Sequence, residues 1–203
     1  EVMSKQSIGV LLMHGGGSSS GSRFAEVAKF LGGYGIVCHA FDFHGSSLAA
    51  REAEAQTELE QFIATSHLSL NQIYLWGSSM SGFTACALAQ KYPTLAGLIL
   101  QGAAAYGLDL QDISFGDKFT QKIRQPLSWY TSPRFVQLSQ SPGRTLVIYG
   151  SHDDVIPLDV QSKYAQLADQ VLIIPSVGHK LLLPTGPAAR LGWDKMVQSA
   201  QDF

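Results

Sequence analysis

Short apolar runs alternate with helix-like segments along almost the whole chain, and this alternation constrains the fold more than any other feature. The apolar runs predict strands over residues 8–13, 36–43, 73–76, 98–101, 145–149 and 171–174. Apolar side chains at helical spacing predict helices over residues 24–33, 48–66, 80–92, 157–167 and 187–200. Repeated strand–helix–strand units form a parallel sheet with right-handed crossovers. We therefore predict an α/β protein with a minimal parallel sheet of about six strands and helices on both faces.

The composition agrees with such a sheet. Of the 203 residues, 45% are hydrophobic and only 15% are charged, and parallel strands buried on both faces are almost wholly apolar. A chain of this length buries a large core within one domain. The sequence contains no internal repeat and no linker-like segment, so we predict a single domain over residues 1–203.

One segment, residues 103–143, interrupts the alternation. It contains three prolines, no strand-like run and several aromatic residues, namely Tyr106, Phe115, Phe119, Trp129, Tyr130 and Phe135. A structureless loop of this length is uncommon inside a compact domain. We therefore expect a small, mostly helical, cap-like insertion over the carboxyl ends of the strands. In this interpretation Trp129 and Tyr106 line an apolar substrate pocket.

Charge and hydropathy argue against several kinds of partner. The formal net charge is −2 and there is no basic run, so we expect neither a nucleic acid nor a membrane as a partner. No run reaches the roughly 18 apolar residues of a membrane-spanning helix, and the polar first seven residues lack a secretory signal. Cys38 and Cys86 are expected to be buried free thiols of a reducing compartment. The cytoplasm is therefore the expected location.

Ser79 lies between a strand-like run and a helix-like segment, in the sequence GSSMSG at residues 77–82. A nucleophilic serine on a sharp strand-to-helix turn has its hydroxyl exposed, and such a turn needs small residues two positions to either side. Gly77 and Ser81 are both small, although glycine is more usual at the second position. A serine-rich turn that only caps a helix is the competing interpretation, and Ser78 and Ser81 are rival nucleophiles. The strand before it and the helix after it make Ser79 the predicted nucleophile.

A glycine-rich loop, HGGG at residues 14–17, follows the first predicted strand. Because glycines lack a Cβ, their backbone N–H groups can approach a substrate oxygen closely. We predict an oxyanion hole formed by the N–H groups of Gly16 and Met80, with Gly15 and Gly17 as alternatives to Gly16. A phosphate-binding loop is the competing interpretation, but the sequence has no G-x-G-x-x-G or G-K-[ST] pattern. His14 itself is expected to hydrogen-bond the loop.

Asp153 and His179 follow the fifth and sixth predicted strands, downstream of Ser79. A histidine at this point would take the proton of the serine, and an aspartate would accept its Nδ1–H and stabilise the imidazolium. Asp154 is the nearest alternative acid, and helix capping is the competing role for either aspartate. The other histidines compete with His179 in number only, because none of them follows the last strand. We predict a catalytic triad of Ser79, Asp153 and His179.

The remaining histidines and cysteines do not indicate a metal site. The six histidines show no ligand spacing such as H-E-x-x-H, and two isolated cysteines are not typical of one. We therefore expect neither a metal nor another cofactor.

Together these motifs resemble those of the α/β-hydrolase superfamily, and the resemblance extends over about residues 8–200. The order serine, aspartate, histidine along the chain is the order in these enzymes. The oxyanion loop is matched by LMHGG (12–16), the nucleophile elbow by GSSMSG with Ser81 in place of glycine, and the acid loop by residues 150–157. Residues 41–45 resemble the D-x-R-G-x-G segment, with His44 as a departure. The chain is most similar to small serine esterases, lipases and dienelactone-hydrolase-like members.

The resemblance and the residues together predict a serine hydrolase of the carboxylesterase kind. Ser79 would attack the acyl carbonyl of a small or medium apolar ester, and water would release the acyl group from the acyl-enzyme. A thioesterase or a short-peptide hydrolase with the same triad is an alternative. A hydrolase-fold binding or receptor protein with little activity is another, because a fold alone does not imply activity.

Overall fold

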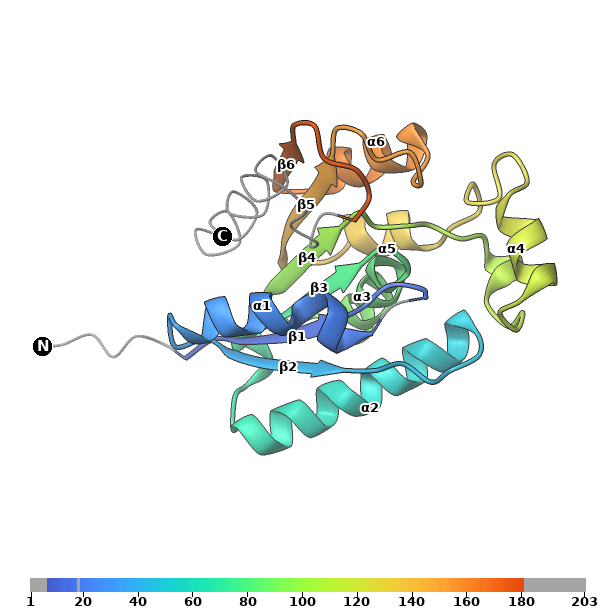
Figure 1. Cartoon of the computed structure of the whole chain (residues 1–203). Helices are drawn as coiled ribbons and strands as arrows, with labels where there is room; N and C mark the ends of the chain where they lie inside the picture. Colours follow the sequence, from blue (N-terminus) through green and yellow to red (C-terminus); the bar gives the residue numbers. More distant parts are fainter. Residues whose placement is uncertain (1–6, 18, 181–203) are drawn as a thin grey trace, which may run out of the picture.

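A parallel sheet forms the centre of the computed structural model, which describes residues 7–17 and 19–180. Its six strands lie in the order β2-β1-β3-β4-β5-β6, and all neighbours are parallel (Figure 1). The strands are β1 (Gly9–Met13), β2 (Val37–Phe41), β3 (Ile73–Ser78), β4 (Gly97–Gln101), β5 (Arg144–Gly150) and β6 (Gln170–Ile174). The predicted α/β class and the six-stranded parallel sheet are confirmed, and every strand lies within two residues of its predicted bounds.

Helices cover both faces of the sheet. They are α1 (Ser20–Gly32), α2 (Leu48–Ser66), α3 (Met80–Lys91), α4 (Asp117–Ile123), α5 (Arg134–Ser139) and α6 (Leu158–Leu167), with 3-10 turns η1 (Leu70–Gln72) and η2 (Leu108–Leu110). No helix in the described part of the chain has the length and apolar character needed to cross a membrane. The helix predicted over residues 187–200 lies outside the described residues.

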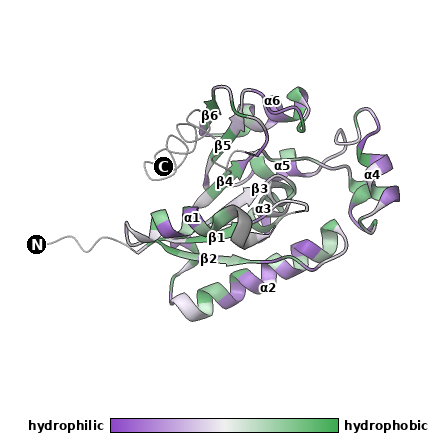
Figure 2. Ribbon diagram, viewed as in Figure 1, coloured by the Kyte–Doolittle hydropathy of each residue, from purple (hydrophilic) through white to green (hydrophobic). Residues whose placement is uncertain are grey.

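The two faces of the sheet bury separate hydrophobic cores. Leu11 and Leu75 point into the core beneath α2, α3 and α6, whereas Leu12 and Trp76 point into the core beneath α1. Successive side chains of a strand point to opposite faces, so a continuous apolar run fills both cores at once. Each fully buried large side chain contributes about 1.5–3 kcal/mol to folding. Figure 2 shows the result as hydrophobic strands beneath helices of mixed hydropathy.

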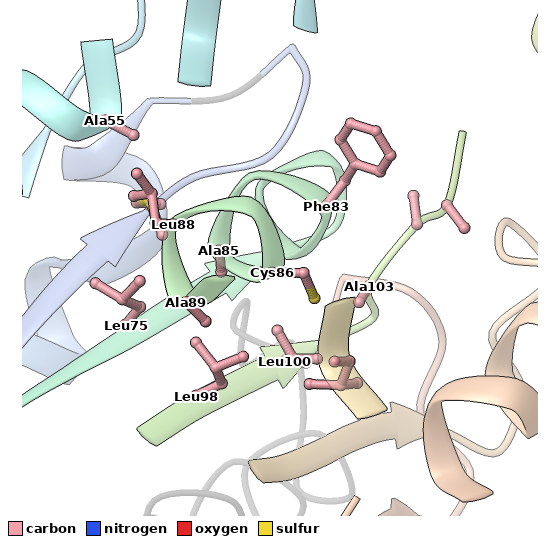
Figure 3. Packing of buried hydrophobic residues seen from close by; sticks show 14 of the residues in the cluster. Ala55, Leu75, Phe83, Ala85, Cys86, Leu88, Ala89, Leu98, Leu100 and Ala103 are labelled. Carbon is pink, nitrogen blue, oxygen red and sulfur yellow. The ribbon is translucent and has the colours of Figure 1, made fainter. Parts of the chain in front are cut away.

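Helix α3 approaches the sheet closely because small residues face it. Ala85 and Ala89 lie against strand side chains such as Leu98 (Figure 3). Nearer its start, a Cβ added to Gly82 would lie only 2.5 Å from the Cβ of Ala103. The N-terminal end of α3 is therefore held against the segment that follows β4, and this contact fixes the turn that contains Ser79.

The carboxyl ends of the strands are aligned. Met13 pairs with Gly77 across β1 and β3, and Ser78 pairs with Gln101 across β3 and β4. The loops that follow β1, β3, β4 and β5 consequently leave the sheet at one edge. In open α/β sheets this edge is where ligands bind, and all of the predicted catalytic residues are on it or in the loop after β6.

The segment 103–143 divides into two parts. Its only regular elements in the structure are η2, α4 and α5, and loops and turns separate them. The first part reaches α4, which lies beyond the ends toward which the arrows of β1, β3 and β4 point (Figure 1). The second part contains α5, which packs against α3 and α6. The first part therefore lies at the end of the sheet where we expected a cap, whose cap-like role stays a prediction, while α5 covers a face of the sheet as a crossover helix does.

Candidate active site

Ser79 lies on the turn from β3 to α3 in a strained backbone conformation, with φ 54° and ψ −115°. A non-glycine residue in such a region costs about 1–3 kcal/mol, and surrounding contacts must hold it there. Its N–H donates to the carbonyl of Gln101 at 2.9 Å, and its own carbonyl accepts from the N–H groups of Gly82 at 3.0 Å and Ala104 at 3.1 Å. The chain on both sides of the turn therefore holds the Ser79 backbone in place.

Small residues around Ser79 are a steric requirement. A Cβ on Gly77 would lie 2.3 Å from the carbonyl oxygen of Ser81, which is far inside contact distance. Ser81 stands where glycine is more usual, and its hydroxyl donates a hydrogen bond to the carbonyl of His14. This bond connects the turn of Ser79 to the glycine-rich loop after β1.

Ser79, His179 and Asp153 are connected by hydrogen bonds. The Nε2 of His179 lies 3.0 Å from the Oγ of Ser79, and its Nδ1 lies 2.9 Å from the Oδ2 of Asp153. The side chain of Asp153 is fully buried, and that of His179 is 14% exposed. The structure thus brings together the three residues that the sequence selected, whereas Asp154 is exposed. In this geometry the imidazole can accept the serine proton while the carboxylate holds its other nitrogen.

The carboxylate of Asp153 is held on both oxygens. Its Oδ1 accepts the backbone N–H groups of Val155 at 3.0 Å and Ile156 at 3.1 Å, which leaves Oδ2 for His179. Hydrogen bonds of this kind to a charged acceptor are stronger than those between neutral groups. The orientation of the acid is therefore set by the loop that carries it.

Gly102 is a positioning residue that sequence reasoning missed. It follows β4 with φ +53°, and a Cβ there would lie 3.2 Å from the Cε1 of His179 and 3.6 Å from the Oδ2 of Asp153. Any side chain at position 102 would therefore press on the histidine–aspartate pair. The only sequence signal for this role is a glycine directly after an apolar strand.

Two backbone N–H groups near Ser79 have no acceptor among the described residues. A Cβ on Gly16 would lie 3.3 Å from the Cε of Met80, so the two residues are neighbours. Met80 is the first residue of α3, and the first N–H groups of a helix have no acceptor within it. Among residues 7–17 and 19–180 no acceptor takes the N–H of Gly16 or that of Met80. The oxyanion hole expected at these two N–H groups stays a prediction.

His14 holds the glycine-rich loop, as the sequence predicted. Its Nδ1 lies 2.7 Å from the carbonyl oxygen of Gly15, and its Nε2 accepts the N–H of Phe43 at 3.0 Å. Because Nε2 is an acceptor here, Nδ1 carries the proton and donates to Gly15. The ring of His14 therefore connects the loop after β1 to the loop after β2.

Tyr106 and Trp129 are both nearly buried. The ring of Tyr106 packs against Phe83 and Phe119 at 5.2 and 5.8 Å between centroids, and the ring of Trp129 packs against Phe135 at 6.3 Å. Only 8% of Tyr106 and 7% of Trp129 is exposed. Burial raises the pKa of the Tyr106 hydroxyl, and the nearby Arg51 cation opposes the rise. Their substrate-binding role stays a prediction.

Arg51 is the second residue that sequence reasoning missed. It lies in the first turn of α2 on the face that carries Ala55, Leu59 and Phe62, and all four residues are buried. Its Nη1 donates to the carbonyl of Gly15 at 3.4 Å. The signal was present, because helical spacing places this charged residue on the apolar face of the helix.

No group of three His, Cys, Asp or Glu side chains in the described ranges is close enough to hold a metal ion. The polar groups that lie near one another at this end of the sheet are the hydroxyl of Ser79, the imidazole of His179, the N–H groups of Gly16 and Met80, and the guanidinium of Arg51.

The six-stranded parallel sheet, with a strained serine turn at its carboxyl edge, has the α/β-hydrolase fold, and the resemblance seen in the sequence is confirmed. A family model described as "Serine aminopeptidase, S33" matches residues 5–142. Because the match covers more than half of the chain, the chain belongs to this family of hydrolases.

Several solved structures share this fold. The monoacylglycerol lipase of Paleococcus ferrophilus is 15% identical with a TM-score of 0.66, over 94% of each chain. Esterase 2 of Thermogutta terrifontis, phosphonylated by sarin, is 16% identical with a TM-score of 0.74, over 97% of this chain and 83% of the esterase. A meta-cleavage product hydrolase of Pseudomonas fluorescens IP01 is 15% identical with a TM-score of 0.65, over 97% of this chain and 92% of that one. No curated protein matches the chain.

Proposed function

We propose that this protein is a serine hydrolase that cleaves a carboxylic ester through an acyl-enzyme. The observation that carries the proposal is the hydrogen-bond path from Ser79 through His179 to the buried Asp153. A serine hydroxyl is a weak nucleophile at its ordinary pKa, so it needs a base within hydrogen-bond distance. His179 is at that distance, and the strained turn presents Ser79 at the end of the sheet where ligands bind.

The reaction follows from these positions. Ser79 Oγ forms a bond to the acyl carbon while its proton passes to His179 Nε2, and the carbonyl oxygen becomes an oxyanion. Protonated His179 then gives the proton to the departing alkoxide, which leaves an ester between Ser79 and the acyl group. Water attacks this ester with His179 again as base, and the acid is released with Ser79 restored. No other reactant is needed.

The remaining groups stabilise charge that develops on the way. Asp153 stabilises the imidazolium form of His179 and holds its tautomer, a role worth about 10⁴-fold in kcat in serine hydrolases. The N–H groups of Gly16 and Met80 would bind the oxyanion, and one such donor is worth about 10²–10³-fold. The start of α3 adds its positive helix end at the same place.

Peptide hydrolysis is the second candidate, because the family model carries the description of an aminopeptidase. An aminopeptidase must hold the free α-ammonium group of its substrate near the scissile bond. The buried charged side chain that contacts the loop of Gly15 and Gly16 is the cation Arg51, which would repel an ammonium group. Ester hydrolysis is therefore the function that we propose, and the esterase and lipase folds among the solved structures are in keeping with it.

The experiment compares p-nitrophenyl butyrate with alanine p-nitroanilide as substrates. We expect the ester to be cleaved with the higher kcat/KM, and Ser79→Ala to lower kcat by at least about 10⁴-fold. Ser78→Ala serves as the matched control because it removes the hydroxyl of the neighbouring serine and keeps the nucleophile. A preference for the anilide would support the peptidase instead. Activity that survives in Ser79→Ala, with a native circular dichroism spectrum, would contradict the assignment of the nucleophile.

A further inference from the structure

The guanidinium of Arg51 contacts Gly15, the residue directly before Gly16, whose N–H is a proposed oxyanion donor. Its Nη1 donates to the carbonyl of Gly15 at 3.4 Å, and a Cβ on Gly15 would lie 2.9 Å from the Cβ of Ser79. The start of α2 therefore brings a fixed positive charge to the same edge of the sheet as the nucleophile. None of the steps proposed above uses this charge.

Aromatic rings hold the guanidinium in place. Its Cζ lies 5.0 Å from the ring centroid of Phe43 and 5.1 Å from that of Phe115. Phe43 follows β2, whereas Phe115 belongs to the segment 103–143, and its N–H donates to the carbonyl of Ser46 at 2.6 Å. Contacts between cations and aromatic faces are worth about 0.5–2 kcal/mol each. They orient the guanidinium but leave its charge uncompensated.

No carboxylate in the described part of the chain lies within ion-pair distance of Arg51, although only 8% of the residue is exposed. Its Nε has no hydrogen-bond partner there either. The carboxylate of Glu54 in the same helix accepts the N–H groups of His44 and Gly45 instead. Burial lowers the pKa of Arg51, and the field of Glu54 only partly opposes this.

Arg134 is a buried arginine that does have a carboxylate partner, although its Nε, like that of Arg51, has no hydrogen-bond partner among the described residues. It is 3% exposed, its Nη2 pairs with Glu52, and its Nη1 donates to Gln137 at 2.7 Å. A buried charge without a partner is strongly destabilising, and proteins pair or neutralise such charges. Among the described residues no carboxylate pairs with Arg51, and an anion bound beside its guanidinium would supply that partner.

We propose that Arg51 binds a carboxylate carried by the substrate, so that the ester cleaved at Ser79 belongs to a molecule with a second, acidic group. This inference rests on the proposed ester hydrolysis. The planar guanidinium is suited to carboxylate recognition, and the rings of Phe43 and Phe115 supply apolar surface beside it. The acid belongs either to the acyl part or to the alcohol part of the ester.

The test uses two matched pairs of esters. For the acyl side, mono-p-nitrophenyl glutarate is compared with p-nitrophenyl butyrate, and for the alcohol side, 4-(butyryloxy)benzoate is compared with its methyl ester. We expect the acidic member of one pair to have at least tenfold higher kcat/KM than its neutral counterpart. Which pair shows the preference identifies the part of the substrate that carries the acid.

Arg51→Met removes the charge at similar side-chain length and should lower the acidic-to-neutral ratio at least tenfold. Arg51→Lys keeps the charge without the planar donors and should retain part of the ratio. Lys91→Met is the matched control, since it removes an exposed cation elsewhere on the chain and should leave the ratio unchanged.

Two results would overturn the inference. One is the absence of any preference for an acidic ester by a wild-type protein that cleaves the neutral ones. The other is an equal loss on acidic and neutral esters in Arg51→Met, which would make Arg51 a residue that only orients the Gly15 carbonyl. Glutarate binding by calorimetry, expected for the wild type and at least tenfold weaker in Arg51→Met, tests the site without catalysis. Failure to cleave any ester would refute the proposed function, while glutarate binding would still decide on Arg51.

Discussion

The carboxyl edge of the sheet and the segment 103–143 are held in place by different means. At the edge, backbone hydrogen bonds hold the functional residues, as when Ser79 bonds to Gln101, Gly82 and Ala104. In the segment, side chains carry much of the attachment, as in the pair of Arg134 with Glu52. Backbone geometry tolerates few residue types, whereas side-chain contacts can be made in many ways. The carboxyl edge can consequently be recognised from short sequence motifs, whereas the segment 103–143 cannot.

The two regions also differ in what their glycines and aromatics do. A Cβ on Gly77 would clash with the backbone of Ser81, and one on Gly102 would press on His179. Both positions therefore favour glycine. The aromatic residues of the segment pack against one another and against α3 and α6, as Phe135 does with Tyr164 at 5.1 Å between centroids. Substitutions in the first region should therefore damage catalysis, and substitutions in the second should first damage stability.

Among the changes that compare these two regions, the largest effect is expected at Asp153. Asp153→Asn should lower kcat by about 10³–10⁴-fold, because an amide cannot hold the imidazole tautomer that accepts the serine proton. Asp154→Asn is the matched control, since Asp154 is exposed and does not contact His179. Steady-state kinetics on p-nitrophenyl butyrate measures both. A larger loss of kcat in Asp154→Asn than in Asp153→Asn would assign the role of the acid to Asp154 and contradict the proposed triad.

In the segment, Trp129→Ala should lower the free energy of unfolding by on the order of 3 kcal/mol, because it removes a buried ring beside Phe135. For a chain of this size such a loss corresponds to about 6–12 °C in Tm. Tyr130→Ala is the control, since Tyr130 is 69% exposed and should cost far less. The ratio of kcat/KM between short and long acyl esters, measured on the same variants, tests the predicted substrate contact of Trp129. A changed ratio would give the segment a part in specificity.

A smaller loss of activity is expected when Gly102, at the carboxyl edge, is replaced. Gly102→Ala should reduce kcat by up to about 10-fold, because the new Cβ would lie 3.2 Å from the Cε1 of His179 and displace the ring slightly, and a shift of about 1 Å in a catalytic group can cost about 10²-fold. Gly35→Ala places an alanine at a similar positive φ, +77°, with nothing within 4 Å. Both variants should lose about 1 kcal/mol of stability from backbone strain, but only Gly102→Ala should lose activity. Equal activity in the two variants would show that the histidine–aspartate pair has room to move.

Much of the fold and of the candidate site is predictable from the sequence. The strands follow from apolar runs that fill two cores, and the positions of Ser79, Asp153 and His179 follow from short motifs at strand ends. These motifs are local, since each one describes a single turn and the residues that can adopt it. The role of His14 in hydrogen-bonding its own loop is predictable for the same reason.

Other features depend on contacts between distant parts of the chain. The carboxyl of Glu52 and the guanidinium of Arg134 meet across 82 positions, and nothing local to either residue predicts the pair. The division of the segment 103–143 depends on the space that α3 and α6 leave for α5. From the sequence, Arg51 can be recognised only as a charged residue on the apolar face of a helix. Its contact with Gly15 cannot be predicted, because it forms only when the loop after β1 is folded against α2.

The most direct test of the central claim is covalent labelling with a fluorophosphonate, read by mass spectrometry of the digested protein. The probe reacts with a serine that a neighbouring histidine activates. We expect one adduct, on the peptide that contains Ser79, which is absent in Ser79→Ala and forms much more slowly in His179→Ala. A wild-type protein that is folded but unlabelled, or one labelled at a different serine, would contradict it.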